Sequence, residues 1–139
     1  MSLIERVETL ARSVAQREAA HADAIARARA KAESLHARIA PAVETFNSVV
    51  REAAPYLEVA LTPLRADDKH LHAVEFDLER GRHRAVVTAK SKGEVTFVGP
   101  FRSGKQEGPC RSLPFEAEEE IEAALAKFLE RFLEAASAP

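Results

Sequence analysis

A helical repeat of apolar residues runs through the first 53 residues and constrains the fold more than any other feature. Steps of three and four place these residues on one face of an amphipathic helix. Between Val14 and Ile25 the positions of the repeat are held by Glu18 and His21, which are not apolar. The spacing there includes an extra step of four, called a stutter, which locally relaxes a left-handed supercoil. We predict one long helix from about residue 3 to about residue 53, with the stripe Leu3, Val7, Leu10, Val14, Ile25, Ala28, Ala32, Leu35, Ile39, Ala42, Phe46, Val49 and Ala53.

Alanine occupies every even position from Ala20 to Ala32. A period of two is typical of a strand, but alanine is the best helix former and is depleted in strands. We interpret the segment as a slender helix that offers little apolar area to a globular core. Pro41 lies within the helical phase, which continues across it, so we predict a kink there rather than a loop. Pro55 ends the element.

After Pro55 the period changes to two, which predicts a four-stranded antiparallel meander within residues 56–98. The expected strands are 56–62, 70–79, 82–90 and a last one that begins at Glu94. A second hairpin around Ser91–Gly93 should pair Lys90 with Glu94 and Thr88 with Thr96, with Gly93 in the left-handed conformation.

The first hairpin should turn around Arg80-Gly81 and pair Glu79 with Arg82. That register brings Asp77 opposite Arg84 on the outer face, where the opposite charges agree with it. Inside, it brings Phe76 opposite Ala85.

Residues 99–114 are rich in glycine, proline and charge and predict a loop, with a short edge strand near residues 110–113. The last helix, 115–136, begins with a cluster of glutamates, which a helix N-terminus favours. Its apolar stripe is Ile121, Leu125, Phe128, Leu129 and Phe132. We expect this stripe, with Phe46, Val49 and Val50 of the first helix, to cover the inner sheet face. The predicted fold class is α+β.

The length of the first helix predicts association. Fifty residues of helix span about 75 Å, whereas a globule of 139 residues is roughly 35–40 Å across. We therefore divide the chain into a protruding coiled-coil segment, 1–40, and an α+β domain, 41–139. The exposed stripe should pair with a second copy, preferably as a dimer, through Leu3, Val7, Leu10, Val14, Ile25, Ala28, Ala32 and Leu35. A fold-back at Pro41 and a different protein partner are the alternatives.

The sharpest chemical motif is GPFRSGK, residues 99–105, which has the glycine and lysine spacing of a phosphate-binding P-loop. Gln106 stands where that motif needs a hydroxyl group, and Gly108-Pro109 cannot begin the helix that would hold phosphate. We interpret the segment as a basic hairpin loop. A small-ligand or enzymatic domain that uses this loop is an alternative function, with Arg102, Lys105, Cys110 and Arg111 as its candidate contacts.

Histidines and acids give no convincing metal site. His70 and His72 share one side of a strand, but we expect His83 about 20 Å away along the hairpin. Nothing in the sequence fixes Asp67 and Asp68 as ligands. We predict no metal and no cofactor.

Two further residues have ordinary interpretations. His21 is expected to be a polar residue of the helix seam, although in a symmetric pair it could meet its mate as a pH-sensitive break. Arg111 beside Cys110 favours a thiolate, but no histidine is close in sequence. We predict no catalytic residue.

The charges argue against a globally basic surface, because 20 basic and 22 acidic residues give a net charge of −2. Basic residues in the first helix wind around it, which favours a solvated exterior over a nucleic-acid accessory role: Arg12, Arg17, Arg27, Arg29, Lys31 and Arg38. We expect neither a signal peptide nor a membrane span, and one cysteine favours the cytoplasm. The leading hypothesis is a non-enzymatic adaptor that self-associates.

Overall fold

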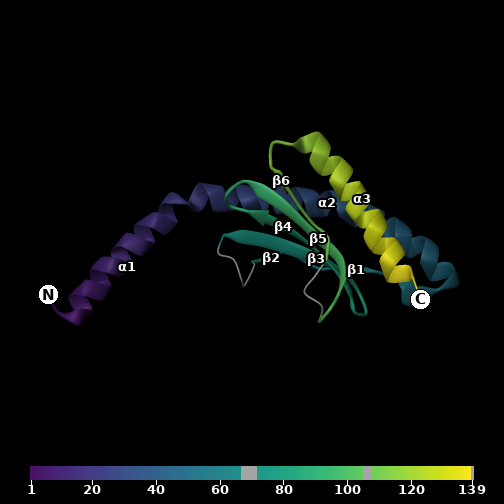
Figure 1. The fold of residues 1–139 in the computed structure, drawn as a ribbon, viewed down its shortest axis with the longest axis horizontal. Helices are drawn as coiled ribbons and strands as arrows, with labels where there is room; N and C mark the ends of the chain where they lie inside the picture. The colour runs from purple at the N-terminus through teal and green to yellow at the C-terminus, as the bar shows by residue number, and fades with distance from the viewer. Residues whose placement is uncertain (67–71, 105–107, 139) are drawn as a thin grey trace.

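The computed structural model describes residues 1–66, 72–104 and 108–138 and has an α+β architecture, which confirms the predicted fold class. A long helical arm leads into one antiparallel sheet, and a last helix returns over that sheet (Figure 1). The elements in chain order are α1 (Leu3–Ala20), α2 (Ala22–Ala53), the 3-10 helix η1 (Pro55–Leu57), β1 (Ala60–Leu61), β2 (Arg65–Ala66), β3 (Ala73–Arg80), β4 (His83–Lys90), β5 (Glu94–Arg102), β6 (Cys110–Pro114) and α3 (Glu118–Ser137).

The first helical stretch is divided at His21 and not at Pro41. His21 closes α1 and opens α2, and its N–H donates to the carbonyl oxygen of Glu18 at 3.0 Å. The helix α2 continues through Pro41, as expected for a segment that keeps its apolar phase across the proline. One unbroken helix over residues 3–53 is therefore wrong. The break lies at the stutter, where no apolar side chain holds the seam together.

The sheet is an antiparallel meander in the order β1, β3, β4, β5, β6, and β2 pairs with β3 beside β1. Pro63 lies between β1 and β2, and a proline has no N–H for the ladder. The sheet has six strands and not the predicted four, for two reasons. The edge that pairs with β3 is interrupted into β1 and β2. Residues 99–114 are not all loop: the first of them extend β5 to Arg102, and the last form β6, the edge strand expected near residues 110–113.

The predicted register of the second hairpin is confirmed. Strands β4 and β5 pair Lys90 with Glu94 and Thr88 with Thr96. Gly93 in the connection has φ +95°, the left-handed conformation that a three-residue loop was expected to need.

The predicted register of the first hairpin is wrong by two residues. Glu79 pairs with Arg84 instead of Arg82, because the turn residues are Gly81 and Arg82. Asp77 and Phe76 consequently lie opposite valines of β4 rather than opposite Arg84 and Ala85. A shift of two residues keeps every side chain on its expected face, so the apolar residues still point inward.

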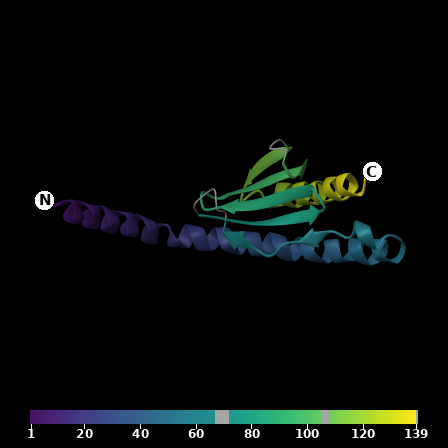
Figure 2. The ribbon, with the colours of Figure 1, turned by 90° about the horizontal axis from the view of Figure 1, so that it is seen from below.

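Both α2 and α3 cover the same face of the sheet (Figure 2). Phe76, Val87 and Phe97 are cross-strand neighbours on that face. The ring of His36 on α2 meets Phe76 edge-on at 5.1 Å, and Phe128 on α3 lies 5.3 Å from Phe97 between ring centroids. The opposite face carries charged and hydroxyl side chains in strand alternation, so the molecule has two layers.

The alanine-rich segment packs against this sheet, contrary to our expectation. Ala28, Ala32 and Leu35 are fully buried, and Ile39 and Val43 continue the same contact toward the end of α2. The helix covers the sheet along this stretch because small side chains allow its backbone to approach closely. The proposed cover by Phe46, Val49 and Val50 is corrected: Phe46 only joins the core edge, Val50 is half-buried, and Val49 is 67% exposed.

Gly99 provides a test of packing between β4 and β5. It is buried with φ +120°, and an added Cβ would lie 3.0 Å from both the Cα atom of Ala85 and the carbonyl oxygen of Arg84. We expect Gly99→Ala to lower the free energy of unfolding by about 2–4 kcal/mol. Gly104 also has positive φ but open space around it, so Gly104→Ala should cost only about 1 kcal/mol. Urea unfolding measures both, and equal losses would contradict the packing argument.

Candidate functional site

The apolar stripe of α1 is exposed along its length. No residue of α1 is buried, and Leu3, Val7, Leu10 and Val14 are between 48% and 77% exposed. Figure 2 shows α1 projecting past the sheet, with no other element of the chain beside it. An exposed row of large aliphatic side chains at helical spacing is typical of an interaction surface.

Local interactions define the start of α1 without help from the domain. The Ser2 hydroxyl accepts a hydrogen bond from the Glu5 N–H at 3.2 Å, and Glu5 lies three residues on, as in a capping box. Further along, Arg12 pairs with Glu8 at 3.2 Å. A helix of 18 residues with these aids is marginal in isolation, which makes a packing partner favourable.

The residues predicted for the oligomer interface divide into two groups. Leu3, Val7, Leu10 and Val14 remain exposed, and Ile25 is half-buried at the start of α2. The other three members, Ala28, Ala32 and Leu35, are fully buried against the chain's own sheet. The part of the stripe that is free for a partner therefore ends near residue 25, not at 35 or 40.

The joint between the helices is in contact with the sheet domain through a histidine. The Nε2 atom of His72, just before β3, lies 2.8 Å from a carboxylate oxygen of Glu18. The His21 and His72 rings stack with centroids 5.7 Å apart. The sequence placed Glu18 beside His21 but gave no sign that His72 would join them, because the contact spans more than fifty residues.

The histidines and acids do not assemble a metal site within the part of the chain that the structure describes. His70, Asp67 and Asp68 lie outside the described residues. His72 and His83 stand at opposite ends of the β3–β4 hairpin, as predicted. Burial, and then the positive charges of Arg102 and Arg80, lower the pKa of His83 from its ordinary value of 6.5.

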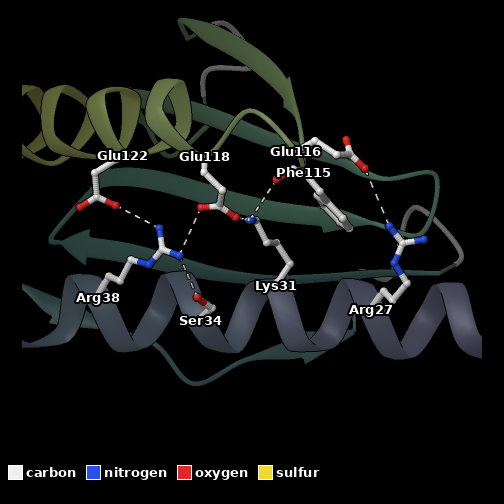
Figure 3. Close-up of polar contacts among 8 residues, drawn as sticks. All are labelled: Arg27, Lys31, Ser34, Arg38, Phe115, Glu116, Glu118 and Glu122. Atoms are coloured by element: carbon white, nitrogen blue, oxygen red, sulfur yellow. Dashed lines mark hydrogen bonds and ion pairs between the residues drawn. The ribbon is translucent and has the colours of Figure 1, made fainter.

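Basic residues of α2 and acidic residues of α3 form a seam of ion pairs (Figure 3). The Lys31 ammonium donates to Glu118 and to the carbonyl oxygen of Phe115, and its side chain is 11% exposed. Arg38 bridges Glu118 at 3.4 Å and Glu122 at 3.0 Å. Arg27 pairs weakly with Glu116 at 4.0 Å.

The seam accounts for two charge patterns of the sequence together. The basic residues Arg27, Lys31 and Arg38 face the chain's own acids, which leaves fewer of them for phosphate contacts. The hydrogen bond from Lys31, and then its charge, lower the pKa of Glu118. The acidic cluster at the start of α3 thus has a partner within the molecule as well as a helix N-terminus.

The segment GPFRSGK is not arranged as a phosphate loop over the residues that are described. Its first four residues belong to β5, and Arg102 and Phe101 pair with His83 and Arg84 of β4. Lys105 lies outside the described residues. A P-loop must wrap its glycines around phosphate before a helix, whereas these residues are held in an antiparallel ladder.

Cys110 and Arg111 lie on β6 and, with residues of α3, line a cavity of about 320 Å³. Cys110 is exposed and pairs with Val98, while Arg111 pairs with the core residue Phe97. Successive strand residues point to opposite faces, so Arg111 points away from the Cys110 thiol. The predicted loop residues are therefore separated: Arg111 belongs to the inner face and Arg102 to the β4–β5 ladder.

The fold and these surfaces define a two-layer α+β protein with a projecting amphipathic helix. No family model matches the chain, and no match was found among curated proteins or among solved structures. Across the described ranges, no helix combines the length and apolar character needed to cross a membrane.

Replacing Lys31 tests the seam. Lys31→Met keeps the apolar stem and helix propensity but leaves the Phe115 carbonyl oxygen and Glu118 without this donor. We expect a loss of roughly 1–2 kcal/mol in the free energy of unfolding. Arg29→Met is the matched control, since Arg29 is exposed on the same helix and makes no ion pair with the described residues, and it should change stability little. Chemical denaturation distinguishes the two.

Glu118 predicts a pH dependence. Because folding lowers its pKa below the ordinary value of 4.5, the unfolded chain binds this proton more readily. Its stabilisation is complete above pH 4.5 and disappears as the pH falls through the lower folded pKa. Glu118→Gln should therefore flatten the acid limb of melting temperature against pH. The control Glu119→Gln, from the same helical turn, should keep the wild-type slope, and a Glu118→Gln profile parallel to wild type would contradict the assignment.

Proposed function

We propose that this protein is a non-enzymatic interaction protein, an adaptor that forms a homodimer through α1. The observation that carries the proposal is a row of aliphatic side chains, 48–77% exposed, on a helix with no buried residue. The sheet domain at the other end of α2 is then available for a second protein. The exposed, unpaired Cys110 thiol fits a reducing compartment, and we propose a cytoplasmic location.

The composition of the stripe supports a second copy of α1 as the occupant. Leu3 and Leu10 alternate with Val7 and Val14 at steps of four and three, so that leucines take d positions and valines take a positions. Leucine at d with a β-branched residue at a favours two-stranded coiled coils. Pairing of identical helices supplies a matching stripe by symmetry.

The charges of α1 also permit self-association. The helix carries three acidic and three basic residues, so two copies do not repel one another through net charge: Glu5, Glu8 and Glu18, with Arg6, Arg12 and Arg17. The contact is short, because the stripe enters the core after Ile25. We therefore expect a concentration-dependent dimer and not an obligate one.

A charge placed on the stripe tests the proposal. Leu10→Glu introduces a carboxylate at a d position, where it would be buried next to its mate, and should raise the dimer dissociation constant by about a hundredfold or more. The control is Val49→Glu, which changes a similarly exposed aliphatic residue of α2, 67% exposed against 60% for Leu10. Sedimentation equilibrium from about ten to several hundred micromolar gives the dissociation constants.

The expected outcome is a monomeric Leu10→Glu variant beside dimerising wild-type and Val49→Glu proteins. Because no residue of α1 is buried in the core, the Leu10→Glu variant should still fold. Circular dichroism checks this. A wild-type protein that stays monomeric over the whole range would overturn the homodimer, and so would two variants that dimerise equally well.

A further inference from the structure

A cavity between β5, β6 and α3 has an apolar floor and a basic rim. Its volume is about 320 Å³, near the lower end of the roughly 300–1,000 Å³ typical of small-molecule sites. Its lining includes Phe97 and Phe128 of the core and the basic residues Arg111, Lys127 and Arg131. The aromatic rings are buried, whereas the three basic residues are exposed, so the charge lies at the mouth and the apolar surface inside.

We propose that this cavity binds a small organic anion in which one carboxylate or phosphate group is attached to a ring or short aliphatic group. The anionic group would lie among the three cations, and its apolar part would fill the cavity beside Pro109, Ala124 and the edges of the two phenylalanine rings. This proposal does not depend on dimerisation through α1, because the cavity is built within one chain.

The three cations reach the cavity from two elements. Lys127 and Arg131 are four residues apart on α3 and thus share one helix face. Arg111 reaches the same space from β6, since its pairing with Phe97 places it on the inner side of the sheet. Three positive charges around one opening attract an anion more strongly than any one of them alone.

These cations lack counter-charges among the residues that the structure describes. None of the three forms an ion pair with a described residue, and no described acidic side chain lines the cavity. On the other flank of α3, in contrast, Lys31 and Arg38 are paired with Glu118 and Glu122. The same helix therefore satisfies the charges on one side and leaves a basic opening on the other.

The inner part of the cavity is apolar and larger than a bare inorganic anion. Phe97 and Phe128 are packed against each other with centroids 5.3 Å apart and are at most 6% exposed, so the core fixes their positions and only their edges reach the cavity. Pro109 and Ala124 add to the apolar lining. An aromatic or branched aliphatic acid would fill a volume of about 320 Å³ better than an inorganic anion would.

Titration with simple probes tests the ligand class. Phenyl phosphate and benzoate carry both parts of the proposed ligand, benzyl alcohol lacks the charge, and inorganic phosphate lacks the ring. Heteronuclear NMR on the full chain should show saturable shifts at Phe97, Arg111 and Arg131 with the first two probes. Benzyl alcohol and inorganic phosphate should each bind about tenfold more weakly or worse.

Variants at the rim localise the binding. Arg111→Gln and Arg131→Gln should each weaken phenyl phosphate binding by about tenfold without unfolding the protein, because both side chains are exposed. Arg82→Gln is the matched control: it makes the same change of charge in the β3–β4 turn, outside the cavity, and should bind as wild type does.

The proposal would be overturned by any of three results. Absence of saturable binding for both aromatic anions would exclude the ligand class. Equal affinity for benzyl alcohol would show that the cations are not used. Equal weakening by Arg82→Gln and the rim variants would show diffuse attraction to the surface rather than a site.

Discussion

The close contact between α2 and the sheet determines the rest of the structure. Ala28 and Ala32 have no exposed surface, and their small side chains allow the helix backbone to lie near the strands. Leu35 and Ile39 then fill the space one and two turns further along. Because α2 occupies only the β3–β4 half of this face, the β4–β5 half remains for α3. Larger side chains at the two alanines would separate the layers and leave voids beside the strands.

Once α2 and α3 lie side by side, their charges have to be complementary. Lys31 is the clearest case, since its side chain is only 11% exposed. Its ammonium group donates hydrogen bonds to the carbonyl oxygen of Phe115 and to the carboxylate of Glu118. Burying most of a lysine without such partners would cost several kcal/mol or shift its titration. The seam therefore also fixes which flank of α3 faces α2. Its other flank, with Lys127 and Arg131, is left at the cavity.

Local patterns predicted what depends on neighbours in the chain. The alternation in 94–98 and the loop with Gly93 gave the right register for one hairpin, because Lys90–Glu94 and Thr88–Thr96 match only in that alignment. In the first hairpin, Glu79 finds an arginine opposite it in either of two alignments, with Arg82 or with Arg84. The turn at Gly81 and Arg82 selects the pairing with Arg84, whereas we predicted the pairing with Arg82. The interrupted pairing at Pro63 and the extension of β5 could not be predicted in this way, because both depend on which strand lies alongside.

Contacts between distant segments were predicted less well. The predicted protrusion of residues 1–40 assumed a round globule beside a helix of about fifty residues, but the sheet lies along α2 and covers it as far as Ala28. Apolar periodicity also gave alanine too little weight as a core residue. For the cavity, a usable signal was present in Lys127 and Arg131, two cations beside the apolar stripe of α3 with no acid four residues before them on that face. What the sequence could not supply was the position of Arg111 opposite them.

The two parts of the helical arm behave differently although one apolar stripe runs through both. From Ala28 to Ile39 in α2 the stripe is buried against the chain's own sheet, whereas in α1 it is exposed, and the change follows the break at His21. An interruption at this point allows α1 to take a direction of its own, so that pairing there need not disturb the core. The contact between Glu18 and His72 limits that freedom by tying the last turn of α1 to the start of β3. A dimer built on α1 would therefore hold its two sheet domains at a defined separation, as the proposed adaptor function requires.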